Sequence, residues 1–155
     1  MFLTFADADF GGDMDSKHST SGMVVKMGTG AISWRSRLQT IITLSTTEAE
    51  YISAVAAAQE IVWLRNLFSE LGYETQSAST LYLDNQSAIA VSRNPEHHGR
   101  MKHLDLHHYW LRDVCKAGII DFKYLPTKSM PADIMTKTLS RPSVMDMKEM
   151  LGLRG

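Results

Sequence analysis

The order of strand-like and helix-like segments is the feature that most constrains how this chain can fold. The alternating pattern FLTFADAD predicts a strand over residues 2–9, and two further strands are predicted over 19–28 and 30–37, joined by a tight glycine-containing turn. Three consecutive strands with short connections favour an antiparallel meander. A long helix is then predicted from about Ser45 to Leu71, and the glycine that follows ends it.

The rest of the chain alternates between strands and helices. Strands are predicted over residues 79–84 and 119–126, and helices over 85–93, 103–116, 131–137 and 143–151. Strands separated by helices favour parallel pairing, whereas the opening meander adds an antiparallel part to the sheet. The sequence therefore predicts an α/β fold: a five-stranded mixed sheet with its first three strands antiparallel, flanked by helices.

Composition bounds the class of protein. With 155 residues, 44% of them hydrophobic, the chain can close one core, so we expect a single domain over residues 1–155. The lone Cys115 rules out an internal disulfide and fits a reducing, intracellular setting. The opening residues resemble neither a signal peptide nor a membrane anchor, and because they begin inside a strand-like pattern we expect a domain cut from a longer polypeptide. The net charge of −1 neither favours nor excludes a nucleic-acid partner.

Two glutamates at the start of the long helix point to opposite faces of it. At about 100° per residue, Glu50 falls on an apolar stripe and Glu48 on the polar face. The segment from Ser45 to Glu48 is typical of a capping box, in which the Glu48 carboxylate accepts a hydrogen bond from the Ser45 amide. Two interpretations stay open for Glu50: its carboxylate reaches water at the rim, or it joins other carboxylates around a cation, which would offset the desolvation. The stripe continues through Ala54, Ala57, Ile61, Leu64 and Phe68.

Three further acids stand at the ends of predicted elements. Asp7 ends the first strand, Asp84 ends a strand that runs into a helix, and Asp133 lies in the first turn of a predicted helix. Each has a structural explanation by itself: a strand-end acid, an N-cap, or a charge that favours a helix start. Together with Glu50, however, they would place four hard oxygen donors at one edge of the sheet, which favours Mg²⁺ over zinc. Strand alternation does not separate Asp7 from Asp9, because both side chains point to the same face.

Seven blocks of sequence together carry a family resemblance that covers almost the whole chain. They are FADADFGGD, STSGMVVKMGTGAISWRSRLQ, LSTTEAEYISA, WLRNLFSELG, LYLDNQSAI, MKHLDL and YLPTKSMPADIMTK. No single block is specific, but the ordered set is. On these motifs the chain resembles the ribonuclease H domain encoded at the end of the pol region of copia-type retrotransposons.

The resemblance implies a fold and an activity. Ribonuclease H domains have a five-stranded mixed sheet flanked by helices, and they cleave the RNA strand of RNA–DNA hybrids with two Mg²⁺ ions, for which Mn²⁺ can substitute. Carried over to this chain, the metal-binding and catalytic acids would be Asp7, Glu50, Asp84 and Asp133. The resemblance thereby favours Asp7 over Asp9, which is left as a candidate outer acid. The products should carry 5′-phosphate and 3′-hydroxyl ends.

The resemblance also implies partners and a location. We expect an RNA–DNA hybrid as the substrate, the reverse transcriptase of the same polyprotein as a neighbour, no membrane association, and a monomeric domain. The expected location is intracellular: the cytoplasm, a virus-like particle or the nucleus.

Candidate substrate-binding residues lie close to the acids in sequence. In the related retroviral domains, a glutamine two residues past the third acid contacts nucleic acid. Here this position is Gln86, with Asn85 beside it. Thr46 and Thr47, at the start of the long helix, are further candidates, although helix capping explains them equally well.

Basic residues provide weaker candidates. The run that contains Arg100, Lys102 and His103 is interpreted either as a phosphate-binding patch or as a solvated helix start. The loop before the last acid lacks the histidine of cellular ribonucleases H, and Lys128 there either replaces its charge or is simply solvated. Arg35, Arg37 and Lys137 are weaker candidates for phosphate contact.

Two other classes of function stay as alternatives. A catalytically silent module of this fold would bind hybrid or scaffold a reverse transcriptase, but it would have no reason to keep four acids. A transposase- or integrase-like nuclease that joins DNA strands usually carries three acids and lacks a glutamate equivalent to Glu50 of TEAEY. The nucleic acid that the protein cleaves separates the three classes.

Overall fold

The computed structural model describes residues 2–93 and 105–153, with side chains for 2–93 and 109–153. Its strands are β1 (Phe2–Asp9), β2 (Thr20–Met27), β3 (Gly30–Leu38), β4 (Ser79–Leu83) and β5 (Ile120–Tyr124). Its helices are α1 (Thr46–Glu70), α2 (Gln86–Arg93), α3 (Asp105–Lys116), α4 (Arg141–Met150) and two short 3-10 helices, η3 (Thr127–Ser129) and η4 (Pro131–Met135). Within these ranges, no helix combines the length and the apolar character needed to span a membrane.

The strands form one mixed sheet in the order β3-β2-β1-β4-β5. β2 pairs antiparallel with both β1 and β3, whereas β4 pairs in parallel with both β1 and β5. The prediction of a five-stranded mixed sheet with an antiparallel start is therefore confirmed. Because β1 and β4 are parallel neighbours, their C-terminal ends meet at one edge of the sheet.

The register between β1 and β4 determines which residues meet at that edge. Phe5 pairs with Tyr82, and their rings stack with centroids 5.2 Å apart and planes inclined by 12°. Asp7 and Asp84 each follow two residues later in the chain, so this register places them level with each other. The strand pattern of the sequence thus explains directly why these two acids lie together.

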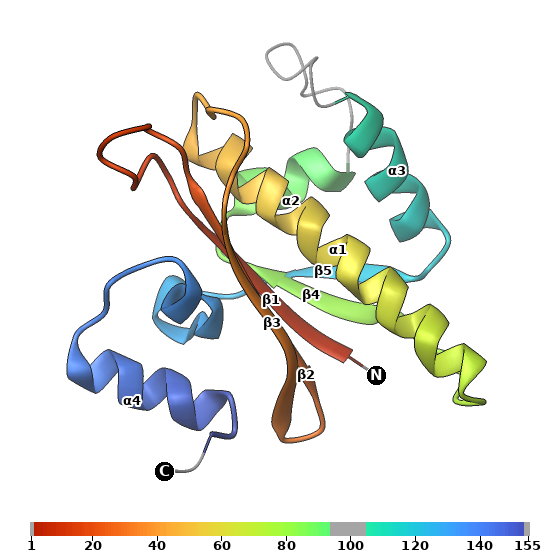
Figure 1. Ribbon diagram of the computed structural model, residues 1–155. Helices are drawn as coiled ribbons and strands as arrows, with labels where there is room; N and C mark the ends of the chain where they lie inside the picture. The colour runs from red at the N-terminus through yellow and green to blue at the C-terminus, as the bar shows by residue number, and fades with distance from the viewer. Residues whose placement is uncertain (1, 94–104, 154–155) are drawn as a thin grey trace.

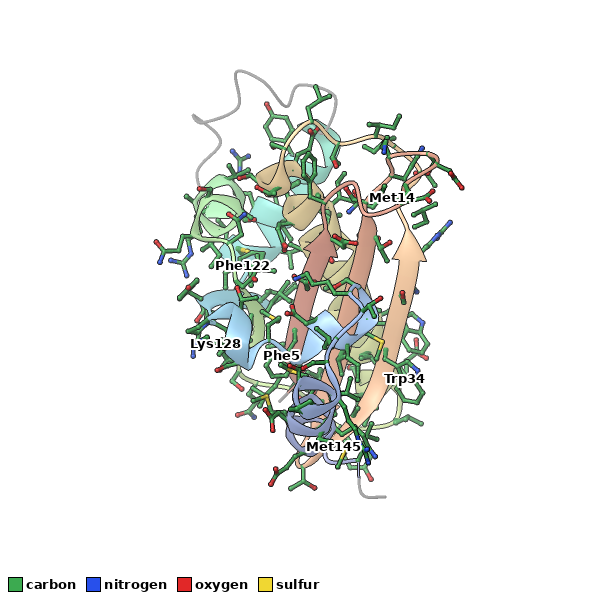
Figure 2. All side chains as sticks on the ribbon, turned by 90° about the vertical axis from the view of Figure 1, so that its left-hand side faces the viewer. Phe5, Met14, Trp34, Phe122, Lys128 and Met145 are labelled. Carbon is green, nitrogen blue, oxygen red and sulfur yellow. The ribbon has the colours of Figure 1, made fainter. Side chains whose placement is uncertain are left out.

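Helices cover both faces of the sheet. Figure 1 shows α1, α2 and α3 on one side and η4 with α4 on the other. The even-numbered residues of Phe2–Ala8 are all buried on the side of α1, whose predicted stripe packs against the sheet through residues such as Ala54 and Ile61. Figure 2 looks onto the opposite face, where Phe5 lies near the centre and Trp34 on the outer strand.

The C-terminal elements differ in extent from the predicted ones. Residues 131–137, predicted as a helix, form only the short η4, because the amides of Asp133 and Thr136 bond to carbonyls three residues earlier, at 3.2 and 3.1 Å. α4 begins earlier than predicted, since the side chain of Ser140 caps it. β5 is shorter than the predicted strand.

Candidate active site

Three carboxylates converge where β1 and β4 end. Asp7 comes from β1 and is completely buried, Asp84 follows β4 directly, and Asp133 lies in η4 and is 6% exposed. Each offers one oxygen atom, and these oxygens lie within 4.8 Å of one another. Acids from three separate elements are thereby brought into an arrangement that could hold a cation.

A lysine lies within this cluster. Lys137 Nζ is 3.0 Å from Oδ1 of Asp7 and 3.2 Å from Oδ1 of Asp133. The hydroxyl of Thr136 donates a hydrogen bond to Oδ2 of Asp7, so both oxygens of that carboxylate are engaged. A metal ion that binds Asp7 through Oδ1 would therefore displace Lys137. The sequence suggested Lys137 only as a weak phosphate contact, and its spacing of four residues from Asp133 was the one signal of this pairing.

Glu50 approaches the cluster from the N-terminal end of α1. Its Oε1 accepts a hydrogen bond from the Ala8 amide at 3.1 Å, and its Oε2 has no hydrogen-bond partner within the described part of the chain. Burial, reinforced by the charges of Asp7 and Asp84, raises the pKa of Glu50 to about 9. With 6% exposure, Glu50 does not reach water at a rim. It lies outside the group of three converging oxygens, so its part in a metal site stays a prediction.

The cluster carries more negative charge than its lysine balances. Burial and the charge of Asp7 raise the pKa of Asp133 to about 6. Burial alone would lower the pKa of Lys137, but the carboxylates of Asp7 and Asp133 outweigh it and raise that pKa overall. Burial is the main cause of the shift at Asp133 and the neighbouring carboxylates are the cause at Lys137, but in both cases the retained proton supplies positive charge beside the buried acids. Divalent cations could supply it instead.

Glu48 departs from its predicted environment. The sequence places it on the polar face of α1, where Gln59 and Glu70 are indeed exposed, but Glu48 itself is only 3% exposed. Its Oε2 accepts a hydrogen bond from the Leu44 amide at 2.6 Å, rather than from the predicted Ser45 amide. The other half of the capping box is confirmed, since Ser45 Oγ accepts from the Glu48 amide at 3.2 Å. The predicted environment was wrong because periodicity gives the face of the helix on which Glu48 lies but not the burial of its first turn.

A hollow of about 630 Å³ opens beside the acids. Glu50 and Asp84 line it together with three of the predicted substrate-binding residues, Thr46, Asn85 and Gln86. The other lining residues are Ala8, Asp9, Phe10, Thr127 and Lys137.

Two residues that line the hollow, Asp84 and Asn85, each accept a hydrogen bond. Thr127 Oγ1 donates to Asp84 Oδ2 at 2.7 Å, and Asn85 Oδ1 accepts from the Ala88 amide at 2.9 Å, which caps α2. Asn85 therefore has a structural role beside its predicted one, whereas Gln86 is exposed at the first turn of α2. Sequence reasoning did not single out Thr127, although it lies in the block YLPTKSMPAD that contains Asp133.

The remaining predicted residues stand apart from the acids. Thr47 is half-buried and does not line the hollow. Asp9 lines the hollow but is not one of the three converging acids. The basic residues Arg100, Lys102 and His103 lie outside the described residues.

Known sequences similar to this chain include transposon polyproteins. It is 39% identical over 149 residues to the retrovirus-related Pol polyprotein from transposon TNT 1-94 of Nicotiana tabacum, and 35% identical over 149 residues to that from transposon RE2 of Arabidopsis thaliana. Both alignments cover 96% of this chain but only 11% and 10% of the polyproteins, so the chain spans about a tenth of their length. No family model matches the chain.

Solved structures agree with the observed architecture. LC11-RNase H1 in complex with RNA/DNA hybrid superposes with a TM-score of 0.60 at 14% identity, covering 88% of this chain and 94% of that one. The N-terminal RNase H domain of a Mycobacterium tuberculosis protein gives a TM-score of 0.59 at 16% identity, covering 87% and 89%. At these identities the likeness establishes the fold alone. The homologues of this chain are therefore retrovirus-related Pol polyproteins of copia-type retrotransposons, and the segment that matches them has the ribonuclease H-like fold.

Proposed function

We propose that this domain is a divalent-metal-dependent ribonuclease H that hydrolyses the RNA strand of RNA–DNA hybrids. The main observation in support of this proposal is that Asp7, Asp84 and Asp133 converge. Their oxygens lie within 4.8 Å of one another in a largely buried site. Glu50 lies close enough for two of these acids to help raise its pKa. Such a cluster needs cations or protons to balance its charge, and carboxylate oxygens are ligands that Mg²⁺ prefers.

The residues present fit a pair of Mg²⁺ or Mn²⁺ ions. Asp7, Glu50, Asp84 and Asp133 would hold them, and Glu50 Oε2 still lacks a hydrogen-bond partner among the described residues. When bound, such a pair supplies a water of lowered pKa and stabilises the oxygen that leaves phosphorus. The proton that Glu50 retains in the metal-free protein would then be released, because nearby cations lower the pKa of a carboxyl group.

Lys137 would take a second role once it has left Asp7. Its side chain is 32% exposed and lines the hollow, so the ammonium can move toward a bound strand while the backbone stays in place. The ammonium group of Lys137 would then pair with a substrate phosphate near the acids. Lys137 would thus balance the acids in the empty site and a substrate phosphate in the loaded one.

Residues around the hollow are suited to hold the RNA strand. Gln86 and Thr46 are exposed there, and Asn85 stands beside them. Their amide and hydroxyl groups can contact the 2′-hydroxyls and phosphates that distinguish RNA in the wide, shallow minor groove of a hybrid. Thr47 and the basic run of Arg100, Lys102 and His103 are proposed to contact the backbone farther from the acids.

The setting of the reaction is part of the proposal. The chain spans 11% of the TNT 1-94 polyprotein, so we take residues 1–155 as one domain of a longer polyprotein that includes a reverse transcriptase. It would act as a monomer during reverse transcription, in the cytoplasm, a virus-like particle or the nucleus. LC11-RNase H1, which shares the fold, was solved with RNA/DNA hybrid, and this supports the hybrid as substrate.

One observation favours a second candidate function. Lys137 pairs with both Asp7 and Asp133, at 3.0 and 3.2 Å. If this ammonium group never left the acids, the domain would be a silent module that binds hybrid or scaffolds a reverse transcriptase without cutting.

Cleavage of three labelled duplexes separates these functions. RNA–DNA hybrid, duplex DNA and duplex RNA are each incubated with Mg²⁺, Mn²⁺ or EDTA. The proposal predicts that only the RNA strand of the hybrid is cut, that either metal supports cutting, and that the products carry 5′-phosphates. Hybrid binding without cleavage in either metal would identify the silent module. Equal cutting of duplex DNA would contradict the proposal and favour a transposase-like nuclease.

A further inference from the structure

Gly22 leaves a space that the C-terminal part of the chain fills. It pairs with Asp7 across β1 and β2. A Cβ atom added to Gly22 would lie 2.5 Å from Thr136 Cγ2, 2.8 Å from Met135 Cβ and 3.1 Å from the carbonyl oxygen of Ala132. Any larger side chain would therefore require η4, or the residues just after it, to move. Gly22 is not among the glycines with positive φ, so space rather than backbone conformation requires glycine here.

Thr136 connects this close approach to the acids. Its methyl group faces Gly22, and its hydroxyl donates a hydrogen bond to Oδ2 of Asp7. The same hydroxyl lies 3.3 Å from the backbone carbonyl oxygen of Asp133. The side chain of Thr136 therefore contacts Gly22, the carboxylate of Asp7 and the backbone of Asp133. A shift of η4 would for this reason change the positions of both acids together.

Helix α1 holds the Asp7–Gly22 pair from the opposite face of the sheet. Ser53, which is 1% exposed, donates from its hydroxyl to the carbonyl oxygen of Asp7 at 2.7 Å and to that of Gly22 at 3.2 Å. The two strands are therefore not free to retreat from η4. Because close-packed interiors do not absorb an added carbon without displacement, η4 is the part that would give way.

We propose that Gly22 and Thr136 are positioning residues of the active site. Their contact determines how closely Asp133 approaches Asp7, and through that distance it determines the affinity for divalent metal. The inference rests on the proposed function, since it concerns the metal site that these acids would form. Neither residue is a metal ligand; each acts through the acid that it orients.

Gly22→Ala tests the contact, with Gly30→Ala as the matched control. Gly30 also lies in a strand of this sheet, and an added Cβ there would meet nothing within 4 Å. Mn²⁺ binding is measured by isothermal titration calorimetry, a readout that needs no turnover. Gly22→Ala should weaken binding by about tenfold or more, as supporting residues of metal sites do, whereas Gly30→Ala should bind as the wild type does. Wild-type affinity in Gly22→Ala would overturn the inference.

A second substitution at Thr136 provides the rescue. Thr136→Ser keeps the hydroxyl that donates to Asp7 and removes the methyl group that lies nearest to the added carbon. The double variant Gly22→Ala/Thr136→Ser should therefore bind Mn²⁺ more tightly than Gly22→Ala alone. A double variant that binds no better than the single one would count against the inference.

Thr136→Val keeps the test decisive even where Gly22→Ala fails to fold. Valine retains the methyl group but cannot donate to Asp7, so Mn²⁺ binding should weaken while circular dichroism stays unchanged. Unchanged affinity in Thr136→Val would contradict the positioning role. Failure of the proposed function is recognised separately, because the wild-type domain itself would then bind no Mn²⁺ and cut no hybrid.

Discussion

The ammonium group of Lys137 lies 3.0 Å from Oδ1 of Asp7, a carboxylate with no exposure to solvent. It also lies 3.2 Å from Oδ1 of Asp133, so one lysine balances part of the charge of two buried acids. Three carboxylates converge here beside this one ammonium group, so that balance is incomplete. A divalent cation bound here would therefore compete with Lys137 for the same oxygen atoms.

Lys137→Met should destabilise the metal-free domain and increase its response to Mg²⁺. Methionine leaves Asp7 and Asp133 without their ammonium partner, which costs on the order of 1–3 kcal/mol for a pair that is only partly shielded from solvent. The rise in melting temperature on adding Mg²⁺ should exceed that of the wild type, since no lysine competes with the ions. Lys123→Met, at an exposed position of β5, serves as the control. A smaller Mg²⁺-induced rise in Lys137→Met would contradict the competition.

Without metal, the domain should lose stability as the pH rises through the neutral range. The pKa of Glu50 is raised from 4.5 to about 9 in the folded state, so the folded protein keeps a proton that the unfolded chain releases. Between those two values the unfolded state binds fewer protons, and the free energy of unfolding falls by at most about 1.4 kcal/mol per pH unit for this group. Asp133, whose pKa is raised to about 6, adds to the loss at the acidic end of the range.

Urea denaturation in EDTA at about pH 5, 7 and 9 measures this dependence. Glu50→Gln cannot hold or release the proton, so its stability should fall less steeply with pH than that of the wild type. At neutral pH the variant should also be the more stable of the two metal-free proteins. Identical slopes in the two proteins would show that Glu50 does not hold the proton.

Substitutions of Glu48 and Glu50 by glutamine should have sharply different effects on hybrid cleavage. Glu50→Gln removes the anionic group that we propose as a metal ligand, so hybrid cleavage should fall by orders of magnitude while folding is preserved. Glu48→Gln should keep its activity but lose about 1 kcal/mol of stability, because a buried amide is a weaker acceptor for the Leu44 N–H and adds a donor to a buried site. Both variants are matched by circular dichroism and compared at saturating Mg²⁺. An inactive Glu48→Gln beside an active Glu50→Gln would move the metal site to Glu48.

The part of the site that the sequence predicts follows from strand register. Asp7 and Asp84 end parallel neighbouring strands, so alternation and element order are sufficient to bring them together. The burial of Glu50 follows from helical periodicity, because the stripe that it shares is buried along α1, whereas its role as a metal ligand is implied only by the family resemblance. The sequence also predicts Asp133 as an acid in the first turn of a helix, and the structure places it in the short η4 instead.

The other features of the candidate site could not be predicted from the sequence, because they depend on tertiary contacts. Periodicity gives the face on which Glu48 lies, but not its burial or its hydrogen bond from the Leu44 amide. The bond from Lys137 to Asp7 joins residues 130 positions apart, and no local pattern encodes it. The close approach of η4 to Gly22 is likewise a tertiary contact that appears in the sequence only as one glycine in a strand.

Gln86→Ala should weaken recognition of the hybrid without affecting the fold. Gln86 is exposed and lines the hollow, so its loss should raise the KM for hybrid by about fivefold, as expected for one hydrogen bond of about 1 kcal/mol, with little change in kcat. Gln76→Ala, at an exposed position between α1 and β4, is the control. Equal KM values for the two variants would remove Gln86 from the substrate-binding surface.

The rate of RNA-strand cleavage by Asp84→Asn, at saturating Mg²⁺, tests the metal centre most directly. Asparagine keeps the shape of the side chain and can still accept the hydrogen bond from Thr127, but it removes one of the converging charges. The rate should fall by orders of magnitude, while the metal-free variant melts no lower than the wild type because repulsion among the acids is relieved. Asp146→Asn, exposed on α4, should cleave at the wild-type rate. Wild-type cleavage by a folded Asp84→Asn would contradict the assignment of these acids to a catalytic metal site.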